Sequence, residues 1–416
     1  MYIFAANYKN KMKNYTNISK FFLLIIFPLL FVACNDDEDD VVNEVVAPAT
    51  YEFTRDGAST VSFSGQTTRL NQVDAIYNYL NFKAEDGSKP VFKTEAQLKE
   101  MFADGAGFMT ASLNGTGKKV RSKTGSGCNT TTGASVQVFM DNLLKEFATQ
   151  LGTQAAYDTD AANGSAGRVA YTSDPSKVIH VNSKGQELDQ LFVKGLIGGM
   201  ALDQIVNNYI LPCKLDAPGY RDENDAGTTA SGKNYTNMEH KWDEGFGYLY
   251  GQEPDVTRAD LGTAPGGEGT LLMKYFKKIN ADQVAGSKSG EPMGPIVFDA
   301  FKLGRAAIVA GNYEVRDAQA NIIKIQLSKV IAFKAIDYLQ SYMDKMAAGD
   351  RGYAHHALSE GYGFIQSLQF TNDGTDKPYF SGAEVDAMLA DLGDFWNIDN
   401  SKLTSMISTI KSKFSI

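Results

Sequence analysis

Two short stretches of this sequence each place a glutamate four residues after a histidine. EHKWDEGFGYLY, which starts at residue 239, and HHALSEGYGFIQ, which starts at residue 355, align without a gap. They share the pattern H-x-x-x-E-G-[FY]-G in a chain that holds only four histidines in 416 residues. Four residues span about one turn of a helix, so the imidazole and the carboxylate of each pair can meet. The two pairs are His240 with Glu244 and His356 with Glu360.

Three kinds of chemistry fit such a pair. The simplest is a hydrogen bond inside a helical bundle, in which the glutamate accepts from the imidazole. This bond lowers the pKa of the carboxyl group and raises that of the histidine. Imidazole and carboxylate groups from facing helices are also the ligands with which helical bundles bind iron or zinc. The third is catalysis, with the glutamate as a base beside a metal ion. Neither HExxH nor GxSxG occurs in the chain, so no catalytic residue is assigned.

A metal site would draw on both stretches. Asp243 adds a third candidate ligand to the first stretch, whereas its counterpart in the second is Ser359. If pseudo-symmetry relates the stretches, their ligands could converge near the axis; if they lie far apart, each pair is a local hydrogen bond. The candidate metal ligands are His240, Asp243, Glu244, His356 and Glu360. The lone His180 is interpreted as structural.

Both sides of each stretch carry aromatic residues. On a helix, Trp242 and Phe246 share one face, whereas Glu244 and Tyr248 lie about 200° away from it. A helix on the surface of a protein needs aromatic residues on one face at most. We therefore expect neighbouring elements to cover both faces and to bury the two His–Glu pairs at least in part.

A mainly helical body is predicted to position these stretches. Residues 51–65 alternate apolar and polar residues around Asp56-Gly57, which indicates a β-hairpin. Helical periodicity follows at 67–82, 94–102, 136–151, 191–211, 295–310 and 321–346. A long apolar helix precedes each His–Glu stretch. The predicted fold is therefore mainly α, a duplicated helical bundle with a small N-terminal β-hairpin, and residues 51–416 form two related halves, about 51–255 and 256–416.

Three glycines interrupt the core helix at 191–211. Gly195, Gly198 and Gly199 lie within five positions of one another. A glycine inside a helix costs about 1 kcal/mol relative to alanine. We expect that a neighbouring backbone approaches the helix closely at these positions.

The first 50 residues are typical of an export and anchoring segment. A basic stretch and the apolar run at 21–33 end at Cys34, as in a secretory signal peptide spanning residues 1–33. Phe31-Val32-Ala33-Cys34 resembles a lipobox, which implies a lipidated Cys34. The NDDEDD that follows opens an acidic linker at 34–50 and resembles the signal that exports Bacteroidetes lipoproteins to the outer face of the outer membrane. The alternatives are an ordinary signal with an incidental cysteine and a simple charged tether.

Two further features limit the possibilities. Cys128 and Cys213 are a possible disulfide, because an exported protein meets an oxidising compartment. Cys128 lies in a long Gly-, Ser- and Thr-rich loop at 103–135. The formal net charge is −9, and six acids lie at 36–44, so the folded body is only mildly acidic. Binding to nucleic acid needs clustered lysine and arginine and is not expected.

Four segments resemble an uncharacterised family of Bacteroidetes lipoproteins, catalogued as domain of unknown function 4856. They are YEFTRDGASTVSFSGQTTRL, LFVKGLIGGMALDQIVNNYI, EHKWDEGFGYLYG and FKLGRAAIVAG, and the similarity covers nearly the whole mature chain. Many members of the family have a second histidine where Lys241 stands. The family is distantly similar to the imelysins, duplicated helical-bundle lipoproteins linked to iron uptake. Their G-x-H-x-x-E motif is approximated around His240, with Met238 in place of the glycine.

The resemblance implies a surface lipoprotein that binds iron or another nutrient without catalysis. Its expected cofactor is iron or zinc, and its expected partners are the outer membrane, through the lipid, and imelysin-like or other uptake proteins. The alternatives are a metal-dependent hydrolase of imelysin-like type and a structural or carbohydrate-binding accessory lipoprotein. Few tryptophans are present to stack on sugars, since the chain contains only two.

Overall fold

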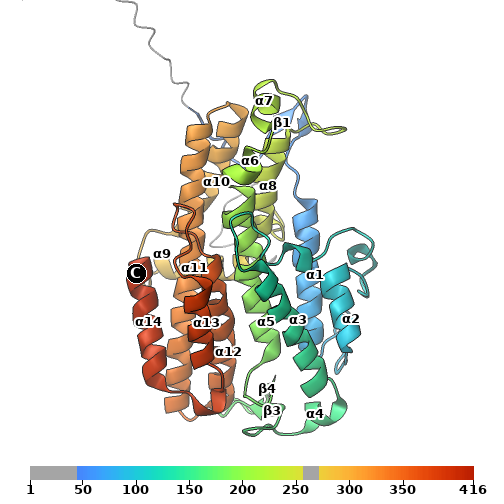
Figure 1. Ribbon diagram of the computed structural model, residues 1–416, viewed down its shortest axis with the longest axis vertical. Helices are drawn as coiled ribbons and strands as arrows, with labels where there is room; N and C mark the ends of the chain where they lie inside the picture. The colour runs from blue at the N-terminus through green and yellow to red at the C-terminus, as the bar shows by residue number, and fades with distance from the viewer. Residues whose placement is uncertain (1–44, 256–270) are drawn as a thin grey trace, which may run out of the picture. The chain divides into compact units, whose positions relative to one another are not determined.

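The computed structural model describes residues 45–255 and 271–416, and these residues form a mainly α-helical fold (Figure 1). The signal peptide, Cys34 and most of the acidic linker lie outside the described residues. So does the segment that would join the two proposed halves, and their division at about residue 255 stays a prediction. In the described part of the chain, no helix is long and apolar enough to cross a membrane.

The helices are α1 (Ser64–Leu80), α2 (Glu95–Lys99), α3 (Gly133–Gln150), α4 (Gln154–Asp158), α5 (Leu188–Leu196), α6 (Pro212–Leu215), α7 (Tyr220–Asp225), α8 (Asn237–Tyr250), α9 (Leu272–Val284), α10 (Met293–Val309), α11 (Tyr313–Ala347), α12 (Arg351–Ser367), α13 (Gly382–Asp391) and α14 (Asn400–Phe414). The two His–Glu pairs lie on α8 and α12. Each of these helices packs against the helix region expected before it, α8 against residues 205–209 and α12 against α11.

Two β-hairpins complete the fold. The predicted N-terminal hairpin is confirmed: β1 (Thr54–Arg55) pairs with β2 (Ala58–Ser59), and Asp56 and Gly57 form the turn with positive φ angles. The second hairpin, β3 (Gly167–Ala170) and β4 (Val178–Val181), was not predicted. Its strands are only four residues long, which is too short for a clear alternation of apolar and polar residues. Figure 1 shows this hairpin beside the start of α5, at the opposite end of the bundle from β1.

Ser367 of α12 inserts its hydroxyl group between two backbone groups of the helix that begins with α5. Ser367 Oγ accepts a hydrogen bond from Gly198 N and lies 2.9 Å from Lys194 O. The hydroxyl thus separates the two groups that would form an ordinary i to i+4 bond, and the helix continues in π-helical form through Ile197–Leu202 and Ile205–Tyr209. A Cβ on Gly198 would overlap Ser367. The expected close approach of a neighbouring backbone is therefore confirmed at Gly198, whereas Gly195 and Gly199 lie against side chains.

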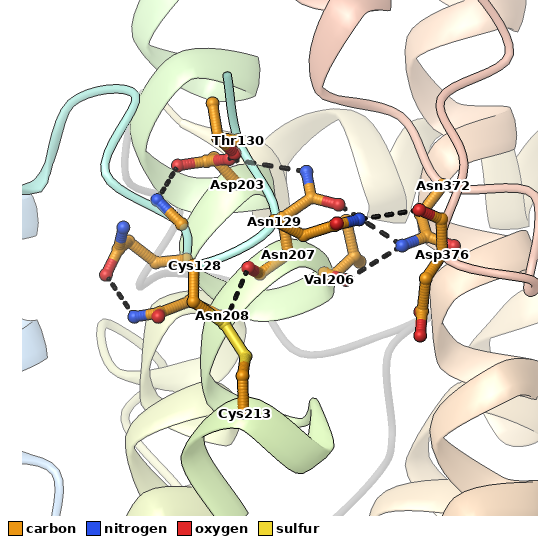
Figure 2. Close-up of a disulfide and its surroundings, with 12 residues drawn as sticks. Cys128, Asn129, Thr130, Asp203, Val206, Asn207, Asn208, Cys213, Asn372 and Asp376 are labelled. Atoms are coloured by element: carbon orange, nitrogen blue, oxygen red, sulfur yellow. Dashed lines mark hydrogen bonds between the residues drawn. A yellow bond between two sulfur atoms is a disulfide. The ribbon is translucent and has the colours of Figure 1, made fainter. Parts of the chain in front are cut away.

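A disulfide joins the long loop at 103–135 to α6, which directly follows this helix. Cys128 and Cys213 are bonded, and their Cα atoms lie 6.6 Å apart. Figure 2 shows the buried Asp203 and Asn207 beside them: Asp203 Oδ2 accepts from Gly127 N at 2.8 Å, and Asn207 O accepts from Asn129 N at 3.1 Å. The loop is therefore tied to the helix by one covalent bond and by backbone hydrogen bonds.

Candidate functional site

Asp243 does not join the His–Glu pair beside it. Consecutive helical residues point about 100° apart, and Asp243 faces the buried Arg305 of α10, whose Nε donates to Asp243 Oδ1 at 3.1 Å. The Tyr51 hydroxyl donates to the same oxygen at 2.8 Å. Burial raises the pKa of Asp243 to about 6, although Arg305 opposes the shift. Asp243 is therefore engaged by Arg305 and Tyr51, and its role as a ligand alongside His240 and Glu244 stays a prediction.

The same ion-pair network fastens the N-terminal hairpin to the bundle. Arg305 Nη1 donates to Glu239 Oε1 at 3.1 Å, and Arg55 of β1 makes two further bonds of 3.0 Å to the Glu239 carboxylate. Trp242 donates through Nε1 to Phe301 O, and its ring fills the space that a Cβ on Gly304 would occupy. Glu239 and Trp242 of the first His–Glu stretch therefore serve mainly to pack and fasten neighbouring elements.

His240 and Glu244 form a loose pair. Nε2 of His240 lies 4.0 Å from Glu244 Oε2, and Glu244 accepts instead from Lys241 Nζ at 2.7 Å and Gln66 Nε2 at 2.9 Å. The imidazole stacks on Tyr235, with the ring centres 4.7 Å apart. Burial lowers the pKa of His240 and outweighs the opposing effect of Glu244. The imidazole is neutral near pH 7, which contradicts the raised histidine pKa expected for this pair.

His356 lies between two carboxylates. Its Nδ1 is 2.7 Å from Glu187 Oε2, and its Nε2 is 3.5 Å from Glu360 Oε2. Lys194 of α5 follows, with Nζ 3.3 Å from Glu360 Oε1. Burial alone would lower the pKa of His356, but the two carboxylates raise it to about 9. The result is a largely buried row of alternating charges, Glu187, His356, Glu360 and Lys194.

The first region, around His240 and Glu244, and the second region, around His356 and Glu360, nevertheless make similar contacts. Gly245 and Gly361 each lie against the helix region that precedes them, next to Tyr209 and Tyr338 respectively. Burial, and then the charge of the glutamate one position before the glycine, raise the pKa of each of these tyrosines. Two residues later, Gly247 and Gly363 lie against an earlier helix, α1 or α5. Those helices supply the second partner of the glutamate, Gln66 to Glu244 and Lys194 to Glu360.

A pocket of about 370 Å³ opens beside His356. It lies among the end of α1, the β3–β4 hairpin, the start of α5 and α12. Its lining is Tyr77, Leu80, Asn81, Phe82, Tyr171, Ser176, Lys177, Val178, Ile179, His180, Glu187, Asp189, Gln190 and His356. A second hollow of about 310 Å³ shares five lining residues with the first: Asn81, Phe82, Ser176, Val178 and His180. The two hollows therefore extend along the hairpin from His356 past His180.

Two adjacent residues of α5 form the polar wall of the pocket. Asp189 Oδ2 accepts from Asn81 Nδ2 at 3.0 Å and from Gln190 Nε2 at 2.9 Å. Gln190 Nε2 also donates to the Tyr77 hydroxyl at 2.9 Å. Oε1 of Gln190 is buried, and no hydrogen-bond partner for it exists in the described part of the chain. Burial, and then the charge of Glu187, raise the pKa of Asp189 well above its usual range.

The side chains around the two pairs do not fit a metal ion. Within residues 45–255 and 271–416, no group of three or more His, Cys, Asp or Glu side chains is arranged to hold one. The two pairs therefore do not combine into the expected shared site. In the second region, both nitrogens of His356 face carboxylates, and a protonated imidazole has no lone pair for a metal.

Sequence reasoning found His356 and Glu360 but missed their neighbours in the pocket. Glu187 and Asp189 precede the apolar core helix as QELDQ, which looks like an ordinary helix start. His180 was interpreted as structural; it stacks on Tyr157 and also lines the pocket. The one available signal was the density of charged and amide residues, 186–190, at the entry to a helix that is otherwise apolar.

Comparison with known proteins gives a family without an activity. A family model described as a domain of unknown function (DUF4856) matches residues 48–416. No curated protein and no solved structure shows significant similarity to the chain. The pocket and its charges are therefore the basis on which a function has to be argued.

Proposed function

The chain belongs to the DUF4856 family, and from its structure we propose that it binds a small polar solute, without transforming it, in the pocket beside His356. The observation that carries the proposal is a pocket of about 370 Å³ whose polar wall is fixed in advance. Ligand sites are commonly preformed hollows of about 300–1,000 Å³ with a few polar groups that fix orientation. Glu187, Asp189 and Gln190 are such groups.

Tight packing behind the pocket supports binding rather than large rearrangement. Glu187 is held by His356, and its backbone N donates to Ser359 Oγ at 2.9 Å. The inserted hydroxyl of Ser367 fixes the register of α12 against the helix carrying Lys194. Groups that are already oriented lose little freedom when a ligand binds, which favours affinity.

Nutrient acquisition is the role proposed for this binding. The imelysin resemblance suggested iron or zinc, but the ion-paired His356 favours an organic solute over a bare metal ion. The pocket also has an apolar side, formed by Leu80, Phe82 and Val178, which suits the carbon skeleton of such a solute. Hydrolysis by a metal-activated water is not proposed, because the donor set does not fit the metal.

Thermal unfolding in the presence of a solute panel tests the proposal. A solute at about 100 times its dissociation constant should stabilise the protein by about 2.7 kcal/mol and raise the melting temperature by a few degrees. Val178→Trp, which fills the pocket from an exposed position, should abolish the shift. Val138→Trp, on the exposed side of α3, is the matched control and should retain it.

Three outcomes would contradict the proposal. One is that no solute shifts the melting temperature, and another is that Val178→Trp and Val138→Trp respond alike. Chemical conversion of a bound solute, followed by mass spectrometry, would show an enzyme instead of a binding protein.

The location on the cell surface is a separate proposal, and it rests on the sequence. Cys34 is proposed to carry the lipid, and NDDEDD to send the protein to the outside of the outer membrane, where it would meet other uptake proteins. Protease added to intact cells should then remove the protein. Replacing residues 36–40 by alanine should protect it. Equal protection of both forms would refute the surface location.

A further inference from the structure

The side chains behind the pocket include more carboxylates than cations. Three carboxylates, Glu187, Asp189 and Glu360, lie at 4–8% exposure, and the cations beside them are His356 and the 2% exposed Lys194. If every group were ionised, the cluster would have one negative charge too many. Burying an unpaired charge costs several kcal/mol, so a protein neutralises or pairs it.

Asp189 is the carboxylate without a cation of its own. Glu187 is paired with His356, and Glu360 with Lys194 and His356, whereas Asp189 forms no ion pair within residues 45–255 and 271–416 and accepts from the side-chain amides of Asn81 and Gln190. The charged groups that face it are Glu187, His356 from α12 and Lys194 from α5. Tyr77 faces it from α1. In the empty pocket, a proton on Asp189 removes the excess charge.

Lys177 does not supply the missing charge. It lines the same pocket from the loop before β4, but its side chain is 67% exposed and its ammonium lies 3.6 Å from Asp174. An exposed, solvated ammonium contributes little to a buried carboxylate. The pocket therefore has room for a further cation on its inner wall.

An unused acceptor lies next to the same carboxylate. Gln190 is 2% exposed and lines the pocket, and its Oε1 has no partner among the described residues. Its amide nitrogen is occupied by Tyr77 and Asp189, so the orientation of the amide is fixed with the oxygen free. A buried acceptor without a donor costs about 1–3 kcal/mol. A ligand that donates hydrogen bonds would relieve that cost.

We propose that the solute carries a primary ammonium group, which lies between Asp189 and Glu187 and donates to Gln190 Oε1. This inference rests on the proposed binding function and names the ligand class for the same pocket. An ammonium group provides three donors and one positive charge in a small volume. The aromatic rings of Tyr77, Tyr171 and Phe82 also line the pocket and favour a cation over an anion.

Binding should release a proton. The ammonium arrives with its charge and replaces the proton on Asp189, which passes to the buffer; no covalent bond changes. At a pH where Asp189 is protonated in the empty pocket, close to one proton leaves for each ligand bound. Affinity should therefore increase with pH until Asp189 is ionised without ligand.

Isothermal titration with matched pairs of amines and alcohols tests the inference. The probes are glucosamine with glucose, ethanolamine with ethylene glycol, and putrescine with 1,4-butanediol. We expect at least one amine to bind, at least tenfold more tightly than its alcohol. At a pH where Asp189 is protonated in the empty pocket, its enthalpy should differ between two buffers of different ionisation enthalpy by the amount for about one proton released.

Two variants separate the carboxylate from the fold. Asp189→Asn resembles the protonated form, so it should keep the melting temperature of the empty protein while losing at least tenfold in amine affinity and losing the proton release. Glu244→Gln, which neutralises a largely buried carboxylate of the first region outside the pocket, is the control and should leave both unchanged. The wild-type proton count needs no variant and keeps the test valid if Asp189→Asn folds poorly.

The outcomes distinguish this inference from the function on which it rests. Binding of an alcohol or an anion that Val178→Trp abolishes, without preference for an amine, would refute the ammonium and keep the binding function. Amine binding without proton release, or with undiminished affinity in Asp189→Asn, would refute the role of Asp189. Failure of every amine to bind would also overturn the inference.

Discussion

The regions around His240 and His356 use one local plan for different ends. In both, a helix rich in glycine packs against the preceding helix region, and the charge of the glutamate helps to raise the pKa of a nearby tyrosine. In the first region, the partner of Glu244 from the earlier helix is a neutral Gln66, and the adjacent Asp243 serves Arg305. In the second, the partner of Glu360 is Lys194, and Ser359 replaces the aspartate. The partners, not the His–Glu spacing, decide the role of each region.

Charge is the second difference between the regions. Lys123 and Lys241 lie near the ring of Tyr209 in the first region, with their ammonium nitrogens 5.2 and 5.8 Å from its centre. Burial, and then the nearby Arg69, lower the pKa of Lys123 to about 8. The second region instead holds an excess of carboxylates. Two helices with the same His–Glu pattern, α8 and α12, can therefore lie in surroundings of opposite charge, depending on the elements packed around them.

The largest expected effect belongs to the structural network of the first region. Arg305→Met removes the cation from the buried Asp243 and Glu239, and such a loss costs about 3–5 kcal/mol of stability. Urea unfolding measures it. Lys402→Met, which breaks the exposed pair with Asp391, is the control and should cost less than about 1 kcal/mol. Similar losses in the two variants would contradict the structural reading of the first region.

The disulfide is expected to stabilise the first region without reaching the pocket. Replacing Cys128 and Cys213 together by alanine should reduce the free energy of unfolding by about 2–4 kcal/mol, because the unfolded chain gains freedom. The affinity of the pocket for its solute, measured below the melting temperature, should stay the same. A loss of affinity in this variant would show that the two regions are coupled.

Opposite dependences on pH should separate the two histidines. The raised pKa of His356, about 9 in the folded chain, stabilises the fold below pH 6.5, and this contribution is lost as pH rises towards 9. A shift of that size corresponds to roughly 3 kcal/mol as an upper value. His356→Gln should flatten the decline of the melting temperature between pH 6.5 and 9. An unchanged decline would refute the ion pair with Glu187.

The smallest effect is expected for His240. Its pKa is lowered by burial, so the fold prefers the neutral imidazole, and stability falls as pH drops below 6.5 through the folded pKa. His240→Gln should reduce this loss in melting curves between pH 4.5 and 6.5, and it should change nothing above pH 7. An effect of His240→Gln between pH 7 and 9 would mean that the two histidines behave alike.

Much of the fold could be predicted from local pattern. The N-terminal hairpin and the helices containing 136–151, 191–209 and 321–346 are present close to the expected positions. The close approach at Gly198 and the partial burial of both His–Glu pairs are also confirmed. These features depend on hydrophobic periodicity and on the steric demands of glycine, which neighbouring residues in the chain already express.

The site itself was only half predictable. The sequence located His356 and Glu360 but grouped Asp243 with His240, because residues close in sequence were taken as close in function. It missed β3–β4, and with it one wall of the pocket. Strands of four residues leave no clear alternating pattern, and pairing between them depends on contacts elsewhere in the fold.

By itself, the sequence determined a mainly α-helical body and two matched His–Glu helices, since both follow from residue types at helical spacing. Only the tertiary structure decided which charges meet. Arg305 reaches Asp243 across 62 positions, and Glu187 reaches His356 across 169. Protonation and binding depend on the distance between charges and on their burial, and both arise when distant segments pack together. For that reason, His240 packs against Tyr235 as a neutral imidazole, whereas His356 is ion-paired and lines a pocket.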